Sequence, residues 1–230
     1  MEQKKGLFIG FEGADGAGKS TQIEIFKQRL EDAGIQNRTL HFPNYESIFG
    51  QQIARYLRGE MGTADSVDPY IATTLYAGDR WVSADEIQCA LDDGEVVIAD
   101  RYVSSCLAYQ GAKIFDNSKR EEFWQWDLHL EYEVYKIPKP EIQIYLHLPL
   151  ELTQKLLAQK GERAYLSGQN DIHETDLDYA GRVEKAYLFL AETDPTLKRI
   201  DCDRGNEIIS PEEIADSVYL NIKNYLPVEV

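Results

Sequence analysis

The stretch Gly13-Ala14-Asp15-Gly16-Ala17-Gly18-Lys19-Ser20 fits the pattern G-x-x-x-x-G-K-[ST]. The residues before it, 7–11, form a short apolar run of the kind found in a strand buried on both faces of a parallel sheet. The residues after it, 20–33, carry apolar side chains at helical spacing and end at Gly34. Since strand, glycine-rich loop and helix occur in this order, we predict a loop whose backbone N–H groups cradle phosphate at a helix N-terminus.

Two side chains at the end of this loop indicate what else it binds. Lys19 is placed to reach the β- and γ-phosphates of a nucleoside triphosphate, and the Ser20 hydroxyl is placed to hold Mg²⁺. The alternative is a glycine-rich turn that binds nothing. The strand and helix on either side of the loop make that the weaker interpretation.

Length and composition limit the class of protein. The 230 residues suffice for one α/β domain with a full core and are too few for two independent catalytic domains. With 24 basic and 40 acidic side chains the formal net charge is −16, which argues against nucleic acid or a membrane surface as the main partner. The three cysteines are widely spaced and predict neither a zinc site nor a disulfide framework. The first apolar run reaches Glu12 too soon for a signal peptide or a membrane span, so we expect a cytoplasmic protein.

The rest of the chain alternates between strand-like and helix-like sequence. Further strands are predicted at 38–42, 96–99, 142–148 and 197–201. This alternation predicts an α/β fold of three layers, in which a mainly parallel sheet of about five strands is flanked by helices. We expect residues 1–230 to form a single domain. A polar segment at about 160–174, which contains Arg163, is typical of a small lid that closes over bound phosphates.

Polar side chains after the predicted strands indicate where an acceptor binds. Asp100 and Arg101 follow the buried strand 96–99, and in open α/β sheets the carboxyl ends of the strands open onto the ligand crevice. An aspartate there can support Mg²⁺, and the adjacent arginine can clamp a phosphate. The alternative is a solvated salt bridge in a turn.

A predicted helix at 68–91 carries Tyr76 and Arg80 four residues apart, and therefore on one face. An aromatic ring beside a guanidinium can stack a nucleobase and hydrogen-bond its edge. Taken alone, Tyr76 is more often a core residue and Arg80 a surface ion pair. The segment 115–139, rich in charged and aromatic residues, is expected to be helical, and the sequence assigns it no chemical role.

Together these blocks resemble the thymidylate kinase family of P-loop nucleoside monophosphate kinases. The resemblance rests on residues 11–22, Phe42-Pro43, Asp79-Arg80-Trp81, Asp100-Arg101-Tyr102, Ser104, Ser105, Tyr109, Gln110 and Gly111, with Arg163-Ala164-Tyr165 and residues 171–174 in the lid. It implies a P-loop NTPase-type fold and transfer of the γ-phosphoryl group of ATP to dTMP, giving dTDP and ADP in dTTP biosynthesis. It also implies Mg²⁺ as the cofactor and a homodimer.

The resemblance assigns roles position by position. Asp15 would accept a hydrogen bond from the sugar 3′-hydroxyl, and Arg101 would hold the dTMP phosphate. The catalytic set is Lys19, Arg101, Arg163 and Asp15, and the metal set is Ser20 and Asp100. The ATP phosphates are assigned to Gly13, Ala14, Asp15, Gly16, Ala17, Gly18, Lys19, Ser20 and Thr21. The dTMP contacts are assigned to Asp15, Phe42, Tyr76, Arg80, Arg101, Ser105, Tyr109 and Gln110.

Within the dTMP set, the resemblance implies that Tyr76 stacks on the base and that Arg80 bonds a thymine carbonyl. The ring of Tyr109 would crowd the sugar 2′ carbon and so disfavour ribonucleotides. Two positions depart from the family pattern. Gly16 stands where eukaryote-like members carry an arginine, which leaves Arg163 to supply that charge, and Cys106 stands where some members place an amide that bonds thymine N3.

Two other functions remain open from the residues alone. A kinase for another deoxynucleoside monophosphate would use the same P-loop and the same Asp100-Arg101 pair. A GTP-binding switch protein would share the P-loop, but the chain lacks an Asn-Lys-x-Asp guanine motif, and a switch has no evident use for the two crevice arginines.

Overall fold

The computed structural model describes residues 6–157, 176–205 and 207–226. Five parallel strands form one sheet in the order β2-β3-β1-β4-β5. Their bounds are β1 Leu7–Glu12, β2 Asn37–His41, β3 Val96–Asp100, β4 Ile142–His147 and β5 Leu197–Asp201. A short antiparallel pair, β6 Asp203–Arg204 and β7 Glu207–Ile208, follows β5. The parallel sheet of five strands predicted from the sequence is confirmed.

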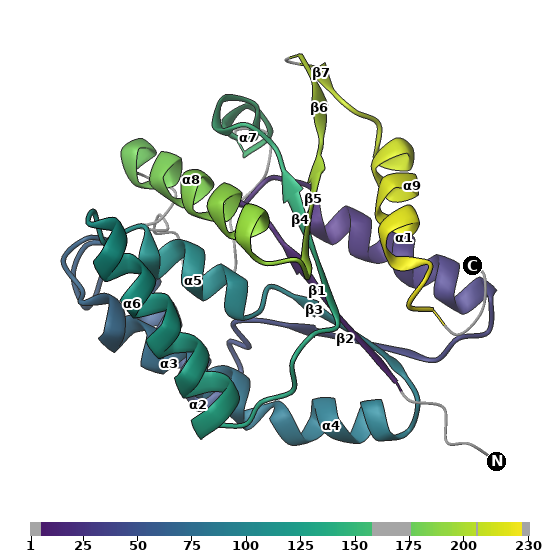
Figure 1. Ribbon diagram of the computed structural model, residues 1–230, viewed down its shortest axis with the longest axis horizontal. Coiled ribbons are helices and arrows are strands. Elements are labelled where there is room, and N and C mark those ends of the chain that lie inside the picture. Colours follow the sequence, from purple (N-terminus) through teal and green to yellow (C-terminus); the bar gives the residue numbers. More distant parts are fainter. Residues whose placement is uncertain (1–5, 158–175, 206, 227–230) are drawn as a thin grey trace.

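Helices cover both faces of this sheet, which gives three layers (Figure 1). The helices are α1 Lys19–Asp32, α2 Ile48–Leu57, α3 Pro69–Val82, α4 Ala84–Asp92, α5 Val103–Gly111, α6 Asn117–Leu128, α7 Leu150–Leu157, α8 Leu177–Thr193 and α9 Pro211–Ile222. A π-helical turn, η1 His129–Val134, continues α6. Helices α1 and α9 pack together on one side of the sheet, while α5 packs against α8, α3 and α6 on the other.

The alternation of side chains along a strand explains the two-sided core. Leu7, Ile9 and Phe11 of β1 pack in one cluster with residues of α1 and α9. Phe8, on the opposite face of the same strand, packs in the other cluster with residues of α4, α5 and α8. Because both faces are covered, β1 is buried along its whole length, as its apolar sequence predicts.

The predicted helix 68–91 is wrong in one respect, because it is two helices. Asp68 caps α3 by accepting hydrogen bonds from two backbone N–H groups of the first turn, and Pro69 occupies the first helical position. The break lies at Ser83, whose N–H bonds back to Arg80 and Trp81 while α4 begins at the next residue. Asp85 and Glu86 in the first turn of α4 were the sequence signal for this second start.

The register of the sheet brings the loops after β1, β2 and β3 together. Asp100 at the end of β3 pairs with His41 of β2 and with Phe11 of β1. The backbone N–H of Arg101 donates to the carbonyl of Phe11 at 2.9 Å. The glycine-rich loop and the Asp100-Arg101 turn therefore lie side by side at the carboxyl edge of the sheet.

Candidate active site

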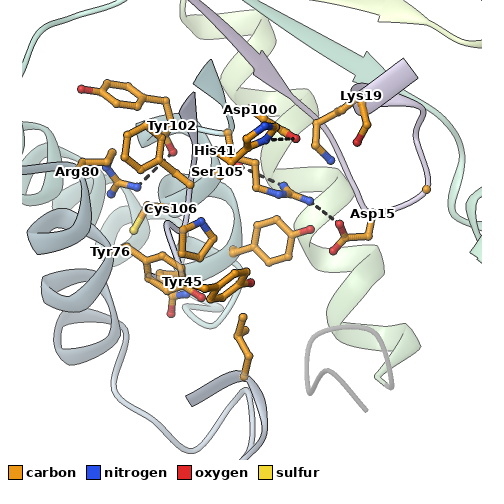
Figure 2. A pocket seen from close by; sticks show the side chains of 18 of the residues that line it. Asp15, Lys19, His41, Tyr45, Tyr76, Arg80, Asp100, Tyr102, Ser105 and Cys106 are labelled. Carbon is orange, nitrogen blue, oxygen red and sulfur yellow. Dashed lines mark hydrogen bonds and ion pairs between the residues drawn. The ribbon is translucent and has the colours of Figure 1, made fainter. Parts of the chain in front are cut away.

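A cavity of about 320 Å³ opens at this carboxyl edge. It is lined by Asp15, Gly16, Gly18, Lys19, Ser20, His41, Phe42, Pro43, Tyr45, Leu57, Tyr76, Arg80, Asp100, Arg101, Tyr102, Ser105, Cys106, Tyr109 and Gln110. Figure 2 shows its two ends, with Lys19 and Asp100 at one and Tyr76, Tyr45 and Cys106 toward the other. One cavity thus joins the glycine-rich loop to an aromatic pocket.

The glycine-rich loop has a backbone that its sequence makes possible. Gly13, Gly16 and Gly18 have φ angles of 144°, 88° and 89°, in a region that other residues rarely adopt. A Cβ on Gly13 would lie 2.7 Å from the carbonyl oxygen of Leu146, so the loop also needs glycine there for space. Ala14 faces a second cavity of about 60 Å³ beside α7 and α8.

Lys19 begins α1 and is buried, with 7% of its surface exposed. Its Nζ donates to the carbonyl oxygens of Gly13 and Ala14, at 3.1 Å each. Burial, and then the nearby charge of Arg101, lower the pKa of Lys19 to about 8. The Lys19 ammonium is therefore held inside the loop. A phosphate bound there would offset the unfavourable burial of this positive charge.

Arg101 is the central cation of the cavity. Its φ of 68° is unusual for a residue other than glycine and turns the side chain back across the glycine-rich loop. The guanidinium donates to the carbonyl of Gly13 at 2.8 Å, to Asp15 Oδ1 at 2.9 Å and to Ser105 Oγ at 3.2 Å. Its Cζ also lies 5.3 Å from the ring centre of Tyr109. The dashed line at Asp15 in Figure 2 marks the pair with this guanidinium.

Glu12 supports this arrangement from behind and was not predicted from the sequence. It is fully buried at the end of β1 and accepts hydrogen bonds from the N–H of Tyr102 at 2.8 Å, Ser105 Oγ at 2.5 Å and Tyr187 Oη at 3.0 Å. Burial raises the pKa of Glu12, although its hydrogen bonds and Arg101 oppose the shift. The available signal was a carboxylate ending an otherwise apolar strand.

Asp100 and Ser20, the two residues predicted to hold a metal, both line the cavity. Burial alone would raise the pKa of Asp100, but the hydrogen bond from His41 and the charges of Lys19 and Arg101 lower it. His41 Nδ1 lies 3.3 Å from Asp100 Oδ2 (Figure 2). The other oxygen, Oδ1, is buried and has no hydrogen-bond partner among the described residues.

These donors fit Mg²⁺ bound together with a nucleotide. A carboxylate oxygen and a hydroxyl are the hard ligands that Mg²⁺ takes, and phosphates and water usually complete its shell. The described part of the chain contains no group of three or more histidine, cysteine or carboxylate side chains that could hold a metal. A metal held by these two donors would take its other ligands from phosphate and water.

The aromatic end of the cavity comes from three elements. Phe42, after β2, packs edge-on against Tyr102 with ring centres 5.5 Å apart. Tyr76 on α3 is half-buried, and Tyr45 lies beside it in Figure 2. Tyr109 on α5 lies where it can contact both Arg101 and a ligand. This end offers flat apolar surfaces of the kind that stack on a nucleobase.

Two polar side chains predicted to contact dTMP, Arg80 and Gln110, have different surroundings. Arg80 lines the cavity but is 2% exposed and bonded to Glu131 of η1, so the surface ion pair considered above is wrong. Both polar atoms of the Gln110 amide are buried in the cavity lining and have no partner among the described residues. Such an amide is available to a ligand.

The cavity brings together most of the residues predicted from the sequence. Arg163 and the lid at 160–174 lie outside the described residues. Gly13, Ala14, Ala17 and Thr21 are not part of the lining. His41, Tyr45, Leu57 and Cys106 line it in addition. Of these, Leu57 at the end of α2 could not be predicted as a lining residue, because its sequence context does not show that α2 packs beside the cavity.

The chain matches known proteins along most of its length. The family model described as thymidylate kinase matches residues 11–212. Thymidylate kinase of Mycobacterium tuberculosis is 34% identical over 80% of this chain and 86% of that protein. Thymidylate kinase of Plasmodium falciparum is 32% identical over 78% of this chain and 80% of its own length. The solved structure of thymidylate kinase from Candida albicans has the same fold, with a TM-score of 0.74 at 24% identity, covering 96% of this chain and 92% of that one.

Proposed function

Because the chain belongs to the thymidylate kinase family, we propose that its cavity binds ATP and dTMP together and transfers the γ-phosphoryl group between them. The reaction is that of a dTMP kinase and gives dTDP and ADP. The acceptor is already a phosphate oxyanion, so no side chain has to act as a general base. Catalysis depends instead on in-line positioning and on neutralising charge as it spreads over the transferred group.

The observation that carries this proposal is the position of Arg101. The same guanidinium bonds the glycine-rich loop through the Gly13 carbonyl and Asp15, and lies over Tyr109 on the acceptor side. A planar guanidinium binds phosphate through two parallel hydrogen bonds. Arg101 would therefore hold the dTMP phosphate next to the loop that holds ATP.

The other site residues have separate proposed contacts with ATP and dTMP. Lys19 would exchange the carbonyls of Gly13 and Ala14 for the β- and γ-phosphates. Asp15 would accept a hydrogen bond from the sugar 3′-hydroxyl. Tyr76 and Phe42 would enclose the base. The contacts of Ser105 and Gln110, and those of the loop residues 13–21, complete the proposed binding surfaces.

Mg²⁺ is the proposed cofactor, held through Ser20 and through Asp100 Oδ1, which has no hydrogen-bond partner in the part of the chain that the structure describes. When bound, it neutralises charge on the β- and γ-phosphate oxygens. Asp100 keeps its negative charge for this purpose, since His41, Lys19 and Arg101 lower its pKa.

We further propose that residues 1–230 act as one catalytic domain with a lid at about 160–174, from which Arg163 would supply positive charge. A homodimer is supported by exposed apolar side chains on α3, where Ile71, Trp81 and Val82 are 63%, 53% and 45% exposed. No helix in the described ranges has the length and apolarity that crossing a membrane requires. A cytoplasmic location is supported by the free thiols of the three cysteines, which suit a reducing compartment.

The test is ADP release from MgATP with dTMP, dUMP, dGMP, dCMP, dAMP, UMP and ribo-TMP offered separately. We expect fast turnover with dTMP, slower turnover with dUMP and little with ribo-TMP. A different preferred monophosphate would keep the kinase mechanism and overturn the base and sugar contacts. Turnover that does not depend on any acceptor would overturn the kinase assignment.

A further inference from the structure

A buried cluster of charged side chains lies behind the base end of the cavity. It joins Arg80 of α3 to Asp127 of α6 and Glu131 of η1, beside Cys106 of α5. Arg80 is 2% exposed, and both carboxylates are 0% exposed. Of these four residues, only Arg80 and Cys106 line the cavity. The two carboxylates therefore form a layer that a ligand in the cavity does not touch directly.

The pairing of Arg80 with Glu131 uses one edge of the guanidinium. Arg80 Nε donates to Glu131 Oε2 at 2.7 Å, and Nη2 donates to Oε1. Nη1 lies 3.5 Å from the carbonyl oxygen of Tyr102, at the limit of a hydrogen bond. The dashed line from Arg80 in Figure 2 marks this last contact. The carboxylate takes the Nε–H and one N–H of Nη2, and Arg80 lines the cavity, so its other N–H groups remain for a ligand bound there.

The charges of the cluster are balanced by this pair. Burial, together with the charge of Glu131, raises the pKa of Asp127 well above its usual value, which favours a neutral acid. Glu131 is then the counter-ion of Arg80. An arginine has a long side chain with many rotamers, and a two-point contact with a carboxylate fixes both its position and its plane.

A guanidinium fixed in this way before the ligand arrives does not lose that freedom on binding. The same fixed plane discriminates between bases, because a donor that cannot move cannot adapt to a base edge with a different pattern of donors and acceptors. Removing Glu131 would leave Arg80 in the pocket but let it move, and would leave its charge buried without compensation.

We propose that Glu131 is a positioning residue for base recognition, which holds Arg80 so that its free N–H groups meet the base edge of dTMP. The inference rests on the proposed dTMP site. It gives the segment 115–139 a role, as the second layer of the base pocket. In this chain Cys106 supplies no amide to the base, so recognition of the base edge would rest on the plane of Arg80 together with the Gln110 amide.

The test compares Glu131→Gln with Glu133→Gln, the same change two residues away at an exposed position of η1. The expected loss of dTMP affinity is that of one misplaced hydrogen bond to a charged group, so Glu131→Gln should raise the KM for dTMP about 10- to 100-fold. The kcat and the KM for ATP should stay within about threefold, since neither ATP nor the transferred group meets Arg80. The preference for dTMP over dCMP should fall by a similar factor, and Glu133→Gln should match the wild type.

Arg80→Gln and the double variant Arg80→Gln/Glu131→Gln complete a double-mutant cycle for the KM of dTMP. If Glu131 acts through Arg80, Glu131→Gln should add little to the KM for dTMP once Arg80 is gone. A KM for dTMP that Glu131→Gln leaves unchanged, or independent effects of the two changes, would overturn the inference. So would parallel losses in kcat and in ATP affinity, which a merely structural role predicts, whereas a lower melting temperature alone is expected from the uncompensated charge of Arg80.

If dTMP does not bind at the proposed site, the results differ from these, because Arg80→Gln itself would then leave the KM for dTMP unchanged. Should Glu131→Gln not fold, Glu131→Asp keeps the charge and shortens its reach. It should still raise the KM for dTMP selectively, and a KM equal to the wild-type value would overturn the inference.

Discussion

Replacing Arg101 by lysine tests the residue on which the proposed reaction most depends. The guanidinium donates to the Gly13 carbonyl, Asp15 and Ser105 at 2.8–3.2 Å, so it is positioned before substrate binds. A lysine keeps the charge but cannot make these bonds and a two-point phosphate contact from one rigid plane. Loss of one fixed donor to transition-state charge costs about 2.7–4 kcal/mol, so kcat should fall about 10²- to 10³-fold.

The assay is steady-state ADP release with saturating MgATP and dTMP. The backbone conformation does not confound the comparison, because lysine and arginine bear a similar cost at the φ of 68°. Arg38→Lys is the matched control, since Arg38 forms surface ion pairs with Glu86 and Glu95, and we expect about wild-type activity from it. An Arg101→Lys enzyme that keeps kcat within about threefold of the wild type would refute the reasoning.

Three further predictions follow from the loop and the cavity. Gly13→Ala places a Cβ 2.7 Å from the Leu146 carbonyl oxygen at a φ of 144°. Both the melting temperature and the increase in melting temperature caused by ATP should therefore fall. An ATP-induced increase equal to that of the wild type would contradict this prediction. Tyr109→Ala opens the sugar region, and kcat/KM for ribo-TMP relative to dTMP should rise about 10-fold, whereas a constant ratio would exclude the steric role. The pKa of Lys19 is about 8 in the free protein and phosphate favours its charged form, so kcat/KM for ATP should fall as the pH rises through about 8. Calorimetry in buffers of different ionisation enthalpy should then show proton uptake on ATP binding above that pH, and its absence would contradict the assignment.

Local patterns were enough to predict the sheet and the glycine-rich loop. The apolar strand, the glycines and the helix after them are contiguous in sequence, and each is favoured by its own residues. The predicted strand 197–201 has the observed bounds of β5. Placing Asp100 and Arg101 at the crevice needed only the rule that parallel strands end at one edge.

What sequence reasoning missed depends on contacts between distant parts of the chain. Glu131 lies 51 residues from Arg80, and Glu12 lies 175 residues from Tyr187, so no local spacing reveals either pair. Both carboxylates look like ordinary charged residues until the fold buries them. The break at Ser83 is a different kind of miss, because there the capping signal was present and the long helical pattern outweighed it.

The most direct test of the account follows the fate of a labelled γ-phosphate. The protein is incubated with γ-labelled ATP, Mg²⁺ and dTMP, and the products are separated. We expect the label to appear in dTDP only when dTMP is present, with little inorganic phosphate formed. Label released only as inorganic phosphate, at a rate that dTMP does not change, would contradict the account.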